Sequence, residues 1–232
     1  MTHRRRAARY VAPVTPIDLE PTPITVAILL AAGAGTRYRA SVERRRVEPP
    51  NHPGPAPARL DHTLDKLVAL LNGIPLYRHA LDHVLAAAVG PVVVVTGAVP
   101  LDLPPQVIHV DNPDWSLGQA GSLHTGLQVA RELGAGQVIV GLADQPGIPT
   151  EAWRLVAGAP PTWSIVVASY DGRRGPNPVR LLRSTWHELA TTGDEGARPL
   201  MRQRPDLVHE VPCPGSATDI DTLEDLQRWT SS

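Results

Sequence analysis

Residues 24–37 read Ile-Thr-Val-Ala-Ile-Leu-Leu-Ala-Ala-Gly-Ala-Gly-Thr-Arg, and this stretch decides the fold. Ile24 to Leu30 is a continuous apolar run, which is typical of a strand buried on both faces of a parallel sheet. The small residues that follow let the backbone turn tightly and approach a ligand closely. Their N–H groups can bind phosphate oxygens, above all where a helix begins, and Arg37 adds a fork-shaped positive charge.

The same pattern of buried strands and amphipathic helices continues along the chain. Further strand-like apolar runs occupy residues 91–97, 107–110, 137–142 and 164–169. Helical patterns cover residues 75–88, 120–133 and 149–157. Alternating strands and helices over 232 residues predict one α/β domain, a three-layer sandwich around a mainly parallel, Rossmann-like sheet.

Two segments lack this pattern. Residues 1–23 are rich in arginine and proline, and we expect a disordered N-terminal tail before a domain spanning residues 24–232. Residues 39–62 combine proline with arginine and histidine and show no periodic apolar signal. They predict a Pro/Arg-rich loop insertion that leaves the fold beside the glycine-rich turn.

Composition limits the classes of function. The formal net charge is -1, so no global basic field attracts nucleic acid or a membrane surface, and polyphosphate binding requires a local site. Cys213 is the single cysteine, which excludes an intrachain disulfide or a cysteine-based zinc site and fits a reducing cytoplasm. No apolar stretch approaches the roughly 18 residues of a membrane span. We therefore expect a cytoplasmic protein.

The glycine-rich turn fits neither of two common phosphate motifs. The dinucleotide fingerprint needs a third glycine where Tyr38 stands, and the lysine of the Walker A motif is absent. Taken alone, Gly-x-Gly after a strand is equally compatible with a structural turn.

The wider pattern resembles a known family. Residues 30–37, then Asp65-Lys66-Leu67 and Gly73-Ile74-Pro75-Leu76, are similar to the signature of the MobA-like NTP transferases, which have a GT-A-like nucleotidyltransferase fold. The resemblance implies that Lys66 neutralises charge on the triphosphate. It also implies nucleotide binding by Leu30, Ala31, Ala32, Gly33, Gly35, Thr36 and Arg37. Two positions depart from the pattern: Arg39 replaces a glycine and Asp65 a proline.

Residues 112–123 follow the third strand and open a helix. A capped helix start explains the small and hydroxylated residues there. The stretch also resembles the Asn-Pro-x-Trp…Gly-x-x-Ser-Ser-Leu segment of the molybdenum cofactor cytidylyltransferase branch, which implies that Asn112, Gly118 and Ser122 frame the nucleotide.

Asp144 stands where a buried strand ends. Ligands of parallel sheets gather at that edge, and a hard carboxylate there suits Mg²⁺ or Mn²⁺. Asp144-Gln145-Pro146 resembles the metal motif of the same branch. Asp219-Ile220-Asp221-Thr222 resembles its Asp-Ile-Asp-Thr element, which implies a second metal carboxylate from Asp219 or Asp221, with Asp219 favoured. Thr222 and Asp225 also fit a helix cap, so Asp221 has a structural alternative.

Residues 175–179 and 193–198 can be a tight turn and a helix start. They also resemble elements that border the acceptor pocket of the branch. The resemblance implies substrate binding by Asn177, Pro178, Gly196 and Arg198, with Arg198 on the acceptor phosphate.

The resemblance covers about residues 24–230 and implies a metal-dependent nucleotidyltransferase with Arg37, Lys66 and Asp144 as catalytic residues. It points to transfer of CMP from CTP to the phosphate of molybdenum cofactor (molybdopterin), with a molybdoenzyme or insertion chaperone as a further partner. CTP is favoured because the loop reads Leu-Ala-Ala-Gly, where the guanylyl branch has Leu-Ala-Gly-Gly. Two alternatives stay open: a GTP-using or other MobA-like enzyme with a different phosphorylated substrate, and a non-catalytic nucleotide- or cofactor-binding module.

Overall fold

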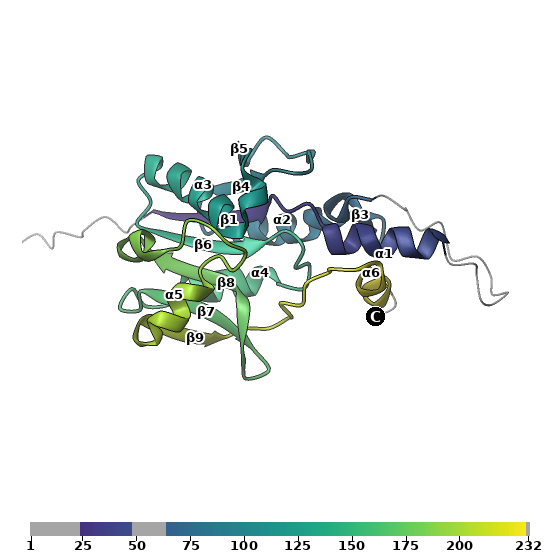
Figure 1. Ribbon diagram of the computed structural model, residues 1–232. Helices are drawn as coiled ribbons and strands as arrows, with labels where there is room; N and C mark the ends of the chain where they lie inside the picture. Colours follow the sequence, from purple (N-terminus) through teal and green to yellow (C-terminus); the bar gives the residue numbers. More distant parts are fainter. Residues whose placement is uncertain (1–23, 48–63, 231–232) are drawn as a thin grey trace, which may run out of the picture.

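A seven-stranded sheet covered by helices on both faces organises the chain in the computed structural model, which describes residues 24–47 and 64–230 (Figure 1). The strand order is β5-β4-β1-β6-β8-β7-β9. The strands are β1 (Thr25–Ala31), β4 (Val92–Thr96), β5 (Ile108–Asp111), β6 (Gln137–Leu142), β7 (Ile165–Tyr170), β8 (Arg173–Leu182) and β9 (Val208–Pro212). The predicted α/β sandwich is confirmed.

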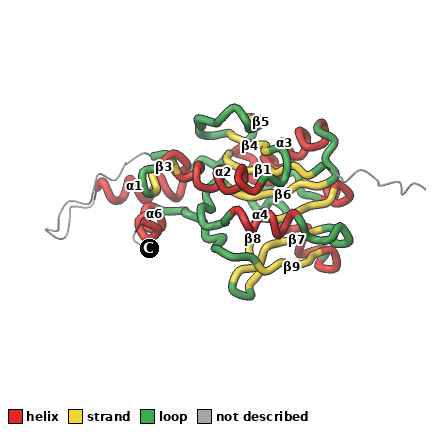
Figure 2. Tube along the Cα trace, turned by 180° about the vertical axis from the view of Figure 1, so that it is seen from behind, coloured by secondary structure: helices red, strands yellow, loops and turns green. Residues whose placement is uncertain are grey.

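Helices form the outer layers because alternate residues of each strand face opposite sides. Val26, Ile28 and Leu30 of β1 pack toward α3 and α5, whereas Ala27 and Leu29 pack toward α2 and α4. Figure 2 shows α2 and α4 together on the face seen from behind. The helices of these layers are α2 (Leu76–Ala87), α3 (Gln119–Glu132), α4 (Thr150–Ala157) and α5 (Arg198–Gln203). The 3-10 turns are η1 (Lys66–Val68), η2 (Trp115–Leu117), η3 (Arg183–Glu188) and η4 (Pro205–Leu207).

Most of the sheet is parallel, and β8 is the exception. β1 pairs in parallel with β4 and β6, and β7 pairs in parallel with β9. β8 runs antiparallel to both β6 and β7. The reason is the tight turn at Asp171 and Gly172, whose positive φ values of 50° and 72° are those of a two-residue hairpin loop. Residues 175–179, read as a turn before a short strand, thus lie inside a ten-residue strand.

A smaller cluster stands beside the sheet. Helices α1 (Thr36–Val47) and α6 (Leu223–Thr230) lie side by side at the right-hand end of Figure 1, next to the short strands β2 (Leu70–Leu71) and β3 (Ile74–Pro75). Its buried apolar residues are Tyr38, Val42, Ala69, Leu71, Leu76, Ile220, Leu223 and Leu226.

Helix α1 corrects the predicted loop insertion. Residues 39–47 of that segment are helical, because Tyr38, Ser41 and Val42 form one buried face at helical spacing. Ser41 Oγ accepts a hydrogen bond from the N–H of Leu223 at 2.8 Å. One of the three buried residues is polar, so the apolar signal was too weak to recognise. The rest of the predicted insertion and the predicted tail, residues 1–23, lie outside the described residues.

Across the described ranges, no helix has both the length and the apolar character that crossing a membrane requires.

Candidate nucleotide site

A cavity of about 740 Å³ opens at the carboxyl ends of β1 and β6. The two strands are parallel neighbours, with Leu30 opposite Leu142, so the segments that follow them begin side by side. This is the edge at which α/β sheets bind ligands. The cavity is lined by residues 30–37 and by Lys66, Leu67, Trp115, Ser116, Gly118, Gln119, Ser122, Leu142, Asp144, Asp194, Arg198, Asp219 and Asp221.

The glycine-rich loop forms one wall of the cavity, and α1 begins directly after it at Thr36. Gly35 has φ +62°, and a Cβ placed on it would lie 2.8 Å from Cβ of Lys66. Only a residue without a side chain allows both this backbone conformation and this approach. The loop and Lys66 are therefore packed directly against each other at Gly35.

Lys66 lies among carboxylates. Its Nζ is 2.6 Å from Oδ2 of Asp144 and 3.2 Å from Oδ1 of Asp221. Arg37 Nη1 lies 2.6 Å from the other oxygen of Asp221. Burial lowers the pKa of Lys66, but the charges and hydrogen bonds of Asp144 and Asp221 outweigh burial and raise it above its ordinary value. The lysine is therefore a cation held by two carboxylates in the lining of the cavity.

The carboxylates fit a divalent cation. Oδ1 of Asp144 is buried and accepts no hydrogen bond within the described part of the chain. Burial, together with the charge of Asp144, raises the pKa of Asp219, as expected for acidic groups held close together. No three His, Cys, Asp or Glu side chains in residues 24–47 and 64–230 converge to enclose a metal by themselves. Mg²⁺ usually takes one or two carboxylates and completes its shell with phosphate oxygens and waters, so two carboxylates suffice.

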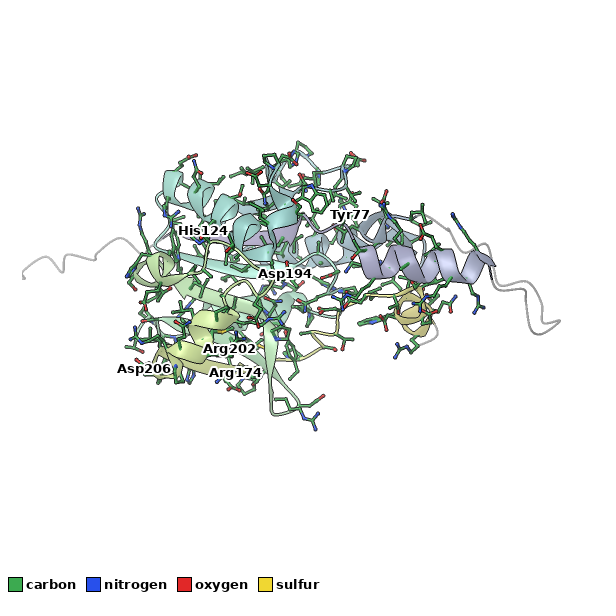
Figure 3. All side chains as sticks on the ribbon, in the orientation of Figure 1. Tyr77, His124, Arg174, Asp194, Arg202 and Asp206 are labelled. Atoms are coloured by element: carbon green, nitrogen blue, oxygen red, sulfur yellow. The ribbon has the colours of Figure 1, made fainter. Side chains whose placement is uncertain are left out.

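The formal charges that line the cavity do not favour a bare polyphosphate. Three cationic side chains (Arg37, Lys66, Arg198) face four carboxylates (Asp144, Asp194, Asp219, Asp221), and three minus four gives -1. Asp194 lies near the centre of Figure 3, between the strands and the α1–α6 pair. This balance favours a triphosphate that carries a cation over a bare one.

Residues 112–123, which lead into α3 and include its first turn, contribute two of their three predicted residues. Gly118 and Ser122 line the cavity, but Asn112 does not. Asn112 is buried and donates a hydrogen bond from Nδ2 to Oγ of Ser122 at 3.0 Å. Asn112 therefore holds the Ser122 side chain in place and does not itself reach the cavity.

Seven lining residues were not assigned from the sequence: Ala34, Leu67, Trp115, Ser116, Gln119, Leu142 and Asp194. Trp115 and Gln119 belong to the quoted motif, and Trp115 is the aromatic side chain of the lining. Asp194 stands within the second C-terminal motif. The motifs gave their positions in the chain, but no spacing rule indicated that these side chains face the cavity.

The predicted substrate-binding residues divide into two groups. Arg198 lines the cavity, whereas Asn177 and Gly196 border only a void of about 10 Å³ beneath it. Pro178 is buried in β8, outside both linings. Asn177 is also buried, and its Nδ2 donates to Oε1 of Gln145 at 2.9 Å. Asn177, Pro178 and Gly196 are thus packed below the site and not exposed to it.

The two departures from the family pattern face each other. Arg39 Nη2 and Asp65 Oδ1 form an ion pair at 2.9 Å, with both side chains partly exposed. The charge of Asp65 is therefore matched locally, at the base of the segment that carries Lys66.

Comparisons with known proteins identify the family of this chain. Residues 27–208 match the family described as the MobA-like NTP transferase domain. The chain is 31% identical over 223 residues to nicotine blue oxidoreductase of Paenarthrobacter nicotinovorans, covering 89% of this chain and 96% of the relative. It is 33% identical over 117 residues to the purine catabolism protein PucB of Bacillus subtilis, covering 48% and 56%.

Solved structures show the same fold. Rv0371c of Mycobacterium tuberculosis has a TM-score of 0.66 at 22% identity, covering 91% of this chain and 99% of that one. A Methanothermobacter nucleotidyl transferase has a TM-score of 0.68 at 19% identity, covering 90% and 96%. The mixed sheet, its helical layers and these neighbours establish the GT-A-like nucleotidyltransferase fold. Because the family match spans most of the chain, the protein belongs to the MobA-like NTP transferases and is a nucleotidyltransferase.

Proposed function

We propose that this protein transfers CMP from CTP to the phosphate of molybdenum cofactor (molybdopterin) and releases pyrophosphate. The observation that carries the proposal is the position of Lys66, bound to Asp144 and Asp221 directly beneath the glycine-rich loop. This arrangement places donors for phosphate oxygens and carboxylates for a cation within one cavity.

The chain acts mainly by positioning and by charge neutralisation. N–H groups of the loop between Gly33 and Thr36 hold the β- and γ-phosphates. Lys66 and Arg37 turn from their carboxylate partners to the triphosphate and stabilise the negative charge that develops on departing pyrophosphate. Gly118 and Ser122 hold the nucleoside at the opposite wall.

Asp144 and Asp219 are the proposed metal ligands, with Asp221 as the alternative second carboxylate. Mg²⁺ or Mn²⁺ supplies charge stabilisation at the α-phosphate when bound. A similar structure, Rv0371C of Mycobacterium tuberculosis, is described as a complex with manganese, with a TM-score of 0.63 at 21% identity and coverage of 91% of this chain.

The acceptor needs no strong general base, because its terminal phosphate is already ionised. Arg198 faces the cavity and holds that phosphate for in-line attack on the α-phosphorus. CTP is preferred to GTP because Ala32 carries a methyl group where the guanylyl branch has glycine. The carbonyl oxygen of Ala32 also accepts the N–H of Ala98 at 3.1 Å, which fixes this part of the loop.

A pyrophosphate-release assay tests the proposal, with four NTPs offered against molybdenum cofactor, sugar phosphates and a phosphorylated acid. We expect turnover with CTP and the cofactor. Equal or higher kcat/KM with GTP would transfer the assignment to the GTP-using alternative. Turnover with another acceptor would replace the cofactor, and tight nucleotide binding without pyrophosphate release would select the non-catalytic module.

The relative named as an oxidoreductase supports a second candidate, reduction of a small molecule, because the match spans nearly its whole length. Tyr38 argues against a nicotinamide dinucleotide in the loop, since it is fully buried at the position of the third glycine in that fingerprint. Incubation with nicotine blue and a reduced nicotinamide cofactor separates the candidates: steady cofactor oxidation favours the oxidoreductase.

A further inference from the structure

A chain of buried amides connects β8 with Asp219. Gln145, which follows Asp144 directly, has no exposed surface. Its Nε2 donates to Oδ1 of Asp219 at 2.6 Å and to the carbonyl oxygen of Ala217 at 2.9 Å. Its Oε1 accepts from Nδ2 of Asn177 at 2.9 Å. All three polar contacts of this side chain are therefore internal.

The partners fix the direction of each amide. A carboxylate and a backbone carbonyl only accept hydrogen bonds, so the NH₂ group of Gln145 must face Asp219 and Ala217. Its oxygen must then face Asn177, which presents its own NH₂ group. If the Gln145 amide were reversed, its oxygen would lie against the carboxylate and repel it.

This arrangement occupies one carboxylate oxygen of Asp219 and leaves the other for the cavity. No hydrogen bond from residues 24–47 or 64–230 reaches the second oxygen. Asp219 itself lines the cavity, whereas Asn177 does not. The amide of Asn177 therefore affects the site only through Gln145.

We propose that Asn177 is a positioning residue, which orients the Gln145 amide so that Asp219 presents its free oxygen to a divalent cation. The proposal rests on the proposed metal role of Asp219. The motif implied that Asn177 contacts the acceptor. In this proposal Asn177 instead supports Asp219, a carboxylate that binds the metal. Residues that hold metal ligands in this way typically change metal affinity about 10–100-fold when they are replaced.

The test measures Mn²⁺ binding in the presence of inorganic pyrophosphate, by water-proton relaxation, with the full chain. Pyrophosphate supplies phosphate oxygens without any assumption about the base or the acceptor. Asn177→Asp is the informative variant, because it keeps the shape of the side chain but removes the donor. The Gln145 amide must then turn its NH₂ group to the new carboxylate and its oxygen to Asp219. We expect Mn²⁺ to bind about tenfold more weakly or worse.

Tyr170→Phe is the matched control. The Tyr170 hydroxyl is buried in the same region and donates to the backbone carbonyl of Asn177 at 2.9 Å. Its removal does not change the orientation of the Asn177 and Gln145 side-chain amides. We expect a lower melting temperature with Mn²⁺ affinity within about twofold of wild type. Asn177→Ala covers the case in which Asn177→Asp fails to fold, because it also removes the donor but adds no buried charge.

The outcomes separate this inference from the proposed function. Unchanged Mn²⁺ affinity in the folded Asn177 variants overturns the inference, as does an equal loss in Tyr170→Phe, which would indicate a purely structural role. Absence of Mn²⁺ binding in the wild type overturns both the inference and the metal assignment. Weaker binding in the Asn177 variants supports the inference, even if CTP proves to be the wrong nucleotide.

Discussion

At the scale of single residues, Gly35 and Lys66 constrain each other. An alanine at position 35 would hold a left-handed φ and would press its Cβ against that of Lys66. The strain costs about 1–2 kcal/mol, and relief requires Lys66 to move away from the loop. We expect Gly35→Ala to lower pyrophosphate release at least tenfold. Gly33→Ala is the control for stability, because a Cβ there meets nothing within 4 Å. Equal melting temperatures and equal rates for Gly35→Ala and wild type would contradict this view of the loop.

Asp144 is the residue on which the proposed chemistry depends most. In Asp144→Asn a neutral amide replaces a hard anionic ligand, so we expect turnover to fall by at least about two orders of magnitude. Lys66 keeps its pair with Asp221, so the melting temperature should stay within about 5 °C of wild type. Asp82→Asn provides the control, since Asp82 pairs with Arg78 on the surface of α2. A wild-type rate at limiting Mg²⁺ would exclude Asp144 as the principal ligand.

At the scale of elements, α1 depends on its narrow buried face. Val42 is fully buried against the α6 cluster, so Val42→Ala should cost about 2 kcal/mol and lower the melting temperature by roughly 4–8 °C. The neighbouring Arg44 is exposed, and Arg44→Ala should leave the melting temperature nearly unchanged. Thermal unfolding followed by circular dichroism compares the two. Similar small shifts for both would show that α1 contributes little to the fold.

Some strands of the sheet could be predicted from the sequence and others only in part. The runs of Val92–Val95 and Val138–Leu142 predicted strands because a buried parallel strand is apolar on both faces. Strand β8 was only partly recognised, because prolines interrupt it at positions 176 and 178. Those prolines lie in residues 175–178, between its two paired segments, where no ladder hydrogen bond to β7 is lost. Such a bulge leaves no simple periodic signal.

For the candidate site, motif order predicted which segments meet but not which side chains face the cavity. Lys66, Asp144 and Arg198 line it as the motifs implied. Asn112 and Asn177 do not, because each is buried and donates to another side chain: Asn112 to Ser122 of the lining, and Asn177 to Gln145 outside it. The residue type alone does not indicate whether a polar side chain contacts a ligand or another polar residue. Only packing distinguishes the two cases.

At the scale of the whole molecule, formal charge affects whether a nucleotide binds with or without a divalent cation. The chain has a formal charge of -1 and the cavity lining also sums to -1, so neither attracts a polyanion. We expect the preferred NTP to bind at least about tenfold more weakly when EDTA replaces Mg²⁺. Calorimetric titration of the same protein in the two buffers measures this. Equal affinities would mean that Arg37, Lys66 and Arg198 are sufficient by themselves.

The contact between Ser41 and the N–H of Leu223 joins residues 182 positions apart. During synthesis on the ribosome, the first partner of this contact is therefore made long before the second. The phosphate loop is synthesised well before Asp219, Asp221 and the α6 cover of α1. A nascent chain therefore carries an uncovered apolar face on α1 and an incomplete cavity.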